Sequence, residues 1–110
     1  MPVRLAASND VVPTLLAMTD ITPTLARTEF LEAHPEWALD GEVLSRTFGF
    51  SDFGQAIGFV TRVALAADRA DHHPDIDIRW NKVLLALTTH SAGGLTAKDL
   101  ALAAEISDWS

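Results

Sequence analysis

The stretch that decides the fold is DIDIRWNKVLLAL, residues 75–87. Apolar and charged side chains alternate along its first half, and a period of two is typical of a β-strand with one buried face. Asn81-Lys82 suits a two-residue turn, after which the apolar face continues. The stretch therefore predicts an antiparallel hairpin. Its buried face would consist of Ile76, Ile78, Trp80, Val83, Leu85 and Leu87.

A second hairpin is expected upstream of this stretch. Strand-like runs at residues 37–39 and 43–50 flank Asp40-Gly41. Asp-Gly between two such runs is a strong short-range signal for a hairpin. The chain thus offers four strands, arranged as two hairpins.

Helical patterns precede and separate these hairpins. The first is expected to begin at Thr22-Pro23, with Thr as the N-cap and Pro at the first helical position, and to end before Pro35. The second would cover residues 52–70 after a cap at Ser51. Its apolar residues recur at three- and four-residue spacing, which gives one buried face. The members of that face would be Phe53, Ala56, Ile57, Val60, Ala64 and Ala67.

A last helix is expected after Gly93-Gly94, where Thr96 and Asp99 resemble a capping box. The order is then helix, two strands, helix, two strands, helix. This order predicts an α+β two-layer sandwich, in which helices pack on one face of a four-stranded antiparallel sheet. Residues 21–110 would form a single domain, preceded by an N-terminal arm at residues 1–20.

Bulk composition excludes several classes of function. The chain has 110 residues and a formal charge of −7, which argues against direct binding of nucleic acid. It has no cysteine, so disulfides, Fe–S clusters and thiol nucleophiles are excluded. Asn9 and Asp10 make the N-terminus a poor signal peptide, and no stretch reaches the roughly 18–20 apolar residues of a membrane span. We expect a cytoplasmic protein with no membrane contact.

Histidines gather at one end of the predicted sheet. His72 and His73 stand between a helix and a strand, and the predicted register places His73 opposite His90, 17 positions later. Such a cluster could perform general acid–base catalysis, because histidine titrates near neutral pH. It could also hold zinc, although adjacent histidines supply two ligands to one ion awkwardly. A polar loop without a function is the third alternative.

The opposite face of the sheet also carries apolar residues, Leu84 and Ala86. Helices can cover only one face of so small a sheet, so a partner subunit is expected to cover the other. The sequence therefore predicts a homo-oligomer, either a dimer or a tetramer.

Residues 42–106 resemble the pterin-4a-carbinolamine dehydratase family. The order and spacing of many residues carry this resemblance, and Trp37 ahead of the first strand also matches. The matching residues are Arg46-Thr47-Phe48-Gly49-Phe50, Asp52-Phe53, Asp68, His72-His73-Pro74-Asp75, Trp80-Asn81, Thr89-His90, Gly94-Leu95-Thr96 and Asp99.

The resemblance implies an enzyme without metal or cofactor, which dehydrates 4a-hydroxytetrahydropterin to quinonoid dihydropterin. This reaction recycles pterin for aromatic amino acid hydroxylases, so a link to phenylalanine hydroxylase is implied as well. His72, His73 and His90 would form the catalytic set. Within that set, His72 and His90 would act as acid and base, and His73 would hold the pterin.

Four further residues are expected at the substrate by the same resemblance: Asp68, Pro74, Trp37 and Asp99. Asp68 could instead lie on a solvated helix face and Pro74 could simply end a polar turn, and the cap of the last helix is the better explanation of Asp99. Trp37 and Trp80 could wall a flat pocket, but the strand pattern favours the core for Trp80. Members of this family also serve as dimerisation cofactors or assembly factors. A non-catalytic binding role and a zinc-dependent enzyme therefore remain the alternatives.

Overall fold

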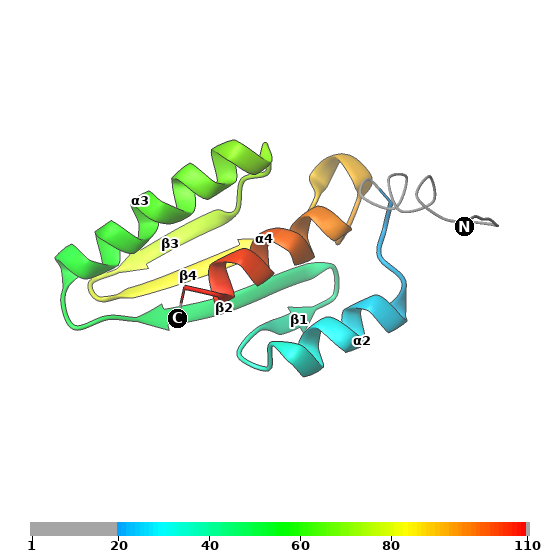
Figure 1. Ribbon diagram of the computed structural model, residues 1–110, viewed down its shortest axis with the longest axis horizontal. Coiled ribbons are helices and arrows are strands. Elements are labelled where there is room, and N and C mark those ends of the chain that lie inside the picture. Colours follow the sequence, from blue (N-terminus) through cyan, green and yellow to red (C-terminus); the bar gives the residue numbers. More distant parts are fainter. Residues whose placement is uncertain (1–19, 110) are drawn as a thin grey trace.

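The computed structural model describes residues 20–109 as a two-layer sandwich, in which helices cover one face of an antiparallel sheet (Figure 1). Its elements are α2 (Thr24–Ala33), β1 (Ala38–Asp40), β2 (Val43–Gly49), α3 (Phe53–Ala70), β3 (Asp75–Arg79), β4 (Lys82–Leu87), the short 3₁₀ helix η1 (His90–Ala92) and α4 (Ala97–Ser107). This order and layering confirm the predicted α+β sandwich. Apart from Asp20, the expected N-terminal arm lies outside the described residues.

The sheet has the strand order β1-β2-β4-β3, so the two hairpins meet along the central pair β2 and β4. Alternate side chains of these two strands point under the helices and form the floor of the core, as expected for strands with one covered face. The floor consists of Leu44, Phe48, Val83, Leu85 and Leu87, each no more than 6% exposed. α3 and α4 run across it in opposite directions (Figure 1). No helix within residues 20–109 has the length and apolar character needed to cross a membrane.

The β3–β4 hairpin forms, but its predicted turn and register are wrong. Arg79 pairs with Lys82, so Trp80-Asn81 makes the turn in place of Asn81-Lys82. Trp80 takes a positive φ of 54°, as the first position of a tight hairpin turn requires. A turn residue is not constrained to the covered face of the sheet. Trp80 is therefore 70% exposed at the hairpin tip and does not lie in the core as predicted.

The β1–β2 hairpin forms as predicted, but its turn lies one residue later than the expected Asp40-Gly41. Asp40 pairs with Val43, which leaves Gly41 and Glu42 as the turn residues. Gly41 has a φ of +61°, a conformation that glycine adopts without steric cost.

The helix starts differ by one residue from those predicted. Pro23 is the N-cap residue of α2, and Thr22 does not cap it because the Thr22 hydroxyl and N–H both donate to the Leu95 carbonyl, at 3.0 and 2.8 Å. At α3 the cap is Asp52 and not Ser51, because the Asp52 carboxylate accepts the Gln55 N–H at 2.8 Å. A side-chain acceptor thus decides the N-cap of α3, whereas α2 begins without a side-chain cap.

α3 is rotated relative to the predicted buried face. Its buried residues are Ala56, Val63, Ala66 and Ala67. Ala56 and Ala67 were predicted, whereas Phe53 is 52% exposed and Ala64 is also exposed. The helix is rich in small apolar residues over most of its circumference, so the three- and four-residue spacing fits more than one face.

Two long-range contacts fix the remaining helices. Arg27 of α2 pairs with Glu42 in the β1–β2 turn through two hydrogen bonds of 2.9 and 2.7 Å, and Glu42 also accepts the Leu95 N–H at 2.9 Å. These hydrogen bonds lower the pKa of Glu42 to about 2. The Trp37 indole N–H donates to Ser107 of α4 at 2.7 Å. The first contact holds α2 and the loop before α4 against the β1–β2 turn, and the second anchors the end of α4 to the core.

Candidate active site

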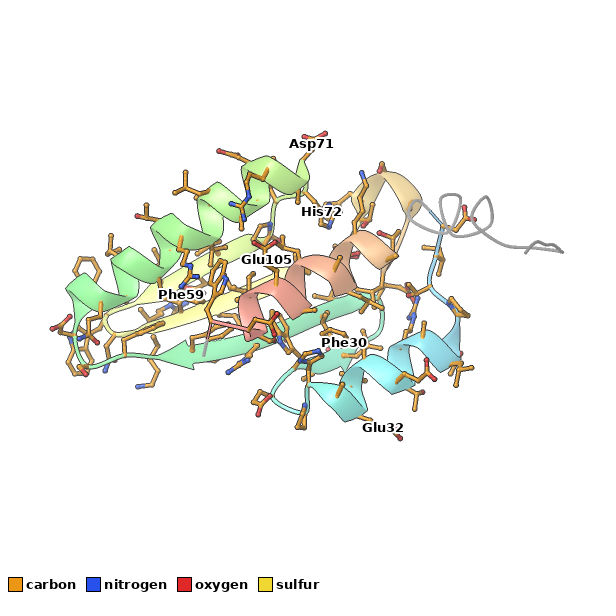
Figure 2. All side chains as sticks on the ribbon, viewed as in Figure 1. Phe30, Glu32, Phe59, Asp71, His72 and Glu105 are labelled. Atoms are coloured by element: carbon orange, nitrogen blue, oxygen red, sulfur yellow. The ribbon has the colours of Figure 1, made fainter. Side chains whose placement is uncertain are left out.

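The site is built around a buried pair, His72 and Asp99. His72 follows the C-cap residue of α3, Asp71, and Asp99 lies in the first turn of α4, 27 positions later. The His72 Nε2 atom is hydrogen-bonded to Asp99 Oδ1, and only 9% of His72 and none of Asp99 is exposed. A carboxylate that binds one imidazole nitrogen fixes the ring orientation and its tautomer. His72 is therefore held in one position at the end of the helix layer (Figure 2).

Asp99 also caps α4, which confirms the predicted capping box with Thr96. Its second oxygen, Oδ2, accepts the Thr96 backbone N–H at 2.9 Å and the Thr89 hydroxyl at 2.8 Å. The Thr96 hydroxyl lies 2.8 Å from that of Thr89 and donates to it, because the Thr89 proton is already directed to Asp99. All these atoms are buried, so the carboxylate is held by hydrogen bonds from both sides.

One carboxylate thus serves two purposes that the sequence presented as alternatives. Oδ2 accepts the hydrogen bond of the helix cap, and Oδ1 is hydrogen-bonded to the His72 ring. Thr89 is the member of this network for which the sequence predicted neither a site role nor a cap role. Two features of the sequence could have indicated its role: Thr89 precedes His90, and it is a polar residue at the end of a buried strand.

His73 and Asp68 form a second, exposed pair. His73 Nε2 lies 3.0 Å from Asp68 Oδ1, and the two side chains are 61% and 72% exposed. Asp68 lies in the last turn of α3, so the helix end presents its carboxylate to the loop that follows. Pro74 completes the loop and is half-buried ahead of β3. His72 and His73 consequently differ: the first is fixed and buried, and the second is open to solvent.

His90 begins η1 and is exposed, and within residues 20–109 its side chain has no hydrogen-bond partner. The predicted strand pairing of His73 with His90 is wrong, because the β3–β4 ladder ends at Asp75 and Ala86, before either histidine. The one-residue shift at the turn displaces the whole register. His73 and His90 nevertheless flank the same end of this hairpin, since one precedes β3 and the other follows β4.

Trp37 does not lie on an open surface. It is 3% exposed, its ring stands edge-on to Phe48 at 6.0 Å, and Ser107 accepts its N–H. Burial favours a packing role for Trp37 over the substrate contact expected from the sequence. Among the described residues, no group of three or more histidine, aspartate or glutamate side chains has the arrangement of a metal site.

The arrangement offers three imidazoles of different character at one end of the sandwich. His72 is bound through Nε2, and its Nδ1 atom has no partner within the described part of the chain. When Nε2 carries the proton that faces Asp99, Nδ1 is left as a proton acceptor. The two exposed histidines can contact a ligand from solvent. Such a set can move protons to and from a bound molecule.

Comparison with known proteins gives consistent results. The family model described as pterin 4 alpha carbinolamine dehydratase matches residues 19–109. A protein of Chloroflexus aurantiacus named "Putative pterin-4-alpha-carbinolamine dehydratase" is 54% identical over 89 residues, which are 78% of this chain and 96% of the relative. A protein of Nocardia farcinica with the same name is 53% identical over 78 residues, 71% of this chain and 82% of the relative.

Two solved structures share the fold. A Brucella melitensis protein described as a transcriptional coactivator/pterin dehydratase is 34% identical, has a TM-score of 0.76, and matches 81% of this chain and 97% of its own. A pterin dehydratase-like protein described as a RuBisCO assembly factor of the alpha-carboxysome has a TM-score of 0.57 at 23% identity. That match covers 68% of this chain and 89% of the assembly factor. At that identity the second match bears on the fold alone.

Proposed function

This chain belongs to the pterin-4a-carbinolamine dehydratase family, and from that premise we propose that it dehydrates 4a-hydroxytetrahydropterin to quinonoid dihydropterin. One observation supports the proposal above all: His72 is buried and oriented by Asp99, which is itself fixed by Thr89 and Thr96. A solvated loop histidine needs no such support. After a two-electron reduction by a separate reductase, the product would again serve an aromatic amino acid hydroxylase, such as phenylalanine hydroxylase.

The chemistry requires two proton transfers and no change of oxidation state. The bond between C4a and the hydroxyl oxygen breaks, and that oxygen takes up a proton and leaves as water. A ring nitrogen of the pterin gives up a proton, and its electrons form the new double bond. A general acid must therefore face the hydroxyl group, and a general base must face the ring nitrogen.

The three histidines suit these steps in different ways. We assign the acid and base roles to His72 and His90, and the binding of the pterin to His73 with its partner Asp68. His72 is fixed, so it can hold a proton at one defined point in space. His73 and Asp68 are exposed side by side, so they can offer both a donor and an acceptor to a heterocycle.

A dehydration assay tests this assignment. A hydroxylase generates the 4a-hydroxytetrahydropterin, and absorbance follows the formation of quinonoid dihydropterin with and without this protein. We expect His72→Ala and His90→Ala to lower kcat by about 10²- to 10⁴-fold, and His73→Ala to raise KM more than it lowers kcat. His34→Ala is the matched control, because His34 caps the end of α2 and stacks on Phe30.

Two outcomes would contradict the proposal. If the folded wild-type protein does not accelerate dehydration, the site does not catalyse this reaction. If stoichiometric zinc accompanies the purified protein and its removal abolishes activity, a metal-dependent mechanism replaces acid–base catalysis by histidine.

A non-catalytic role is the second candidate function. It is supported by the similarity to the Brucella melitensis protein, whose description combines coactivator and dehydratase. In that role the protein would act as a dimerisation or assembly cofactor, and the three histidine variants would bind the protein partner as the wild type does. Their behaviour in a dehydration assay and in a partner-binding assay therefore separates the two candidates.

We also propose that the protein is a homo-oligomer. The sheet face away from the helices carries Val43 and Leu84, which are 38% and 37% exposed, and a second copy would cover them. Light scattering during size-exclusion chromatography measures the mass directly. A monomer at all concentrations would contradict this expectation.

A further inference from the structure

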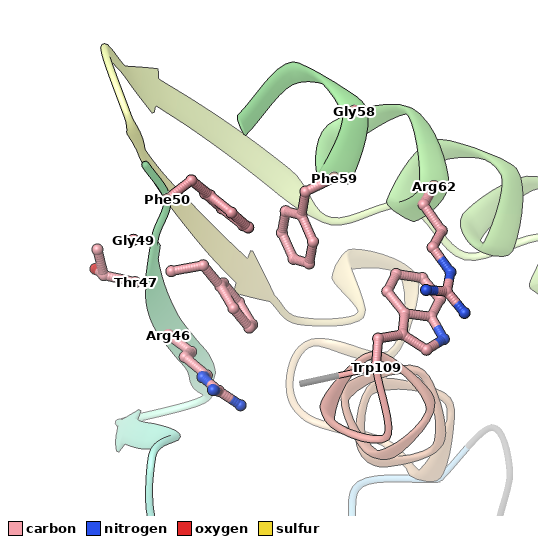
Figure 3. Close-up of a pocket in the computed structure, with 9 residues that line it drawn as sticks. Arg46, Thr47, Gly49, Phe50, Gly58, Phe59, Arg62 and Trp109 are labelled. Atoms are coloured by element: carbon pink, nitrogen blue, oxygen red, sulfur yellow. The ribbon is translucent and has the colours of Figure 1, made fainter. Parts of the chain in front are cut away.

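A cavity lies away from the histidines, between the sheet and α3. Its volume is about 490 Å³, which is within the range of small-molecule sites. It is lined by Arg46, Thr47, Phe48, Gly49, Phe50, Gly58, Phe59, Arg62 and Trp109. These residues come from β2 and the residue after it, from the middle of α3 and from the segment after α4 (Figure 3). Figure 2 shows Phe59 and His72 at separate places along the helix layer.

This cavity contains residues that the proposed function does not use. The run of residues 46–50 carries part of the resemblance to the dehydratase family, yet it contributes to this cavity and not to the histidine site. Trp109 had no expected role in the sequence. The proposed dehydratase reaction therefore does not account for this cavity.

Aromatic rings form the apolar part of the cavity. Phe59 lies at their centre, with ring centroids 4.6 Å from Phe48, 5.0 Å from Phe50 and 6.2 Å from Trp109. Such rings offer flat, rigid surfaces on which another planar ring can pack, either offset or edge-on. The lining therefore favours a planar aromatic ligand.

Two arginines flank the rings on opposite sides (Figure 3). The guanidinium carbon of Arg46 lies 4.2 Å from the centre of the Phe48 ring, and that of Arg62 lies 4.2 Å from the centre of the Trp109 ring. A guanidinium group that stacks on a ring uses its flat face. Its N–H donors point outward in the plane of the group, and they match the oxygens of a carboxylate or phosphate.

Within residues 20–109, neither of these arginines is paired with a carboxylate. Residues 20–109 contain five arginines, and three of them form ion pairs: Arg27 with Glu42, Arg69 with Glu105, and Arg79 with Asp77. The remaining two are the arginines of the cavity. The chain has 15 acidic and 8 basic side chains, so partners for cations are plentiful. The cavity thus combines a lining of aromatic rings with two positive charges that no carboxylate among the described residues pairs with.

We propose that this cavity binds a small organic anion with a planar aromatic ring and a carboxylate or phosphate group. The ring would pack among Phe50, Phe59 and Trp109, and the anionic group would accept hydrogen bonds from Arg46 or Arg62. This site is separate from the dehydratase site and does not depend on the proposed reaction. A neutral heterocycle would lack the group that the arginines recognise.

Matched probes test the charge requirement. 2-Naphthoate and 2-naphthyl phosphate supply the ring with each anionic group, and 2-naphthamide supplies the same ring without charge. Titration calorimetry gives Kd, and the indole N–H signal of Trp109 in NMR spectra reports the place of binding. We expect at least one anion to bind with a Kd of about 1 mM or lower, and the amide to bind at least about tenfold more weakly.

Variants test the role of the arginines. We expect Arg62→Gln and Arg46→Gln each to weaken binding of the anion by about tenfold or more, because a charge-assisted hydrogen bond is lost. Arg79→Gln is the matched control, since Arg79 lies on β3 outside the cavity, and it should leave Kd unchanged. If a Gln variant does not fold, Arg→Lys at the same position retains the charge without the planar fork and should weaken binding less.

Several results would overturn the proposal. Equal affinity for the amide and the anions would show that the arginines do not select charge. Anion binding that perturbs His72 or His90 and leaves Trp109 unchanged would place the ligand in the other site. If neither anion binds even at concentrations several-fold above ~1 mM, the cavity is not an anion site. Loss of dehydratase activity alone would bear on the proposed function and not on this cavity.

Discussion

Replacing Asp99 tests how the helix cap and the catalytic histidine depend on one side chain. Asp99→Ala removes the acceptor of three donors: the His72 ring, the Thr89 hydroxyl and the Thr96 N–H. Hydrogen bonds to a charged group contribute about 1.5–3 kcal/mol each, and a lost cap costs about 1 kcal/mol. Since these effects overlap, we expect the free energy of unfolding to fall by about 3–6 kcal/mol. This is a large part of the roughly 5–15 kcal/mol by which a folded domain is stable.

Asp99→Asn separates stability from activity. The amide oxygen can still accept from Thr89 and Thr96, so we expect a stability loss of only about 1–2 kcal/mol. The amide NH₂ would then face the His72 Nε2 atom and require the other tautomer, with the proton on Nδ1. We therefore expect dehydratase activity to fall by about 100-fold or more although the protein remains folded.

Urea unfolding and the dehydration assay together decide this prediction. Thr89→Val is the matched control, because it removes one donor to Asp99 and leaves the contact with His72 intact. It should cost about 1 kcal/mol and leave most of the activity. Activity of Asp99→Asn within roughly threefold of the wild type would refute the claim that Asp99 orients His72. An Asp99→Ala variant as stable as the wild type would refute the network itself.

Three further predictions concern other parts of the fold. The pKa of Glu42 is lowered from 4.5 to about 2, so its contacts stabilise the protein above pH 4.5, and this stabilisation is lost as the pH falls toward 2. Glu42→Gln should unfold more readily than the wild type at pH 6, and the two acid-unfolding curves should converge near pH 2; a constant difference would contradict this. Trp37→Phe removes the hydrogen bond to Ser107, so we expect the free energy of unfolding to fall by about 1 kcal/mol and kcat to stay at the wild-type value. A fall in kcat at unchanged stability would instead support a substrate role for Trp37. Trp80→Gly should raise the urea midpoint, because glycine adopts the positive φ of 54° freely, and an unchanged or lower midpoint would show that the indole contributes to stability.

Element order was predictable because it depends on local patterns. Alternation along residues 75–87 and the Asp-Gly signal identify both hairpins without any knowledge of distant contacts. Register was not predictable in the same way. The choice between Trp80-Asn81 and Asn81-Lys82 as the turn depends on which residue accepts a positive φ, and tryptophan is a poor candidate on intrinsic preference. The rest of the sheet overrides that preference.

The candidate site was predictable in composition but not in contacts. His72, His73, His90 and Asp99 were all singled out from the sequence. That His72 binds Asp99 depends on how α4 docks against α3, and local patterns do not contain this information. The anionic-ligand cavity was missed for the same reason, because Arg46, Arg62 and Trp109 come from three separate segments.

The hydrogen bonds between Thr22 and Leu95 have a practical consequence for shortened forms of the protein. A chain that starts at Pro23 would retain α2 and all four strands, yet it would lose both bonds to the Leu95 carbonyl and the bridge between Ile21 and Thr96. Those contacts hold the segment that leads into the cap of α4. Residue 21 is therefore the latest starting point that we would choose for crystallisation or for fusion to another domain.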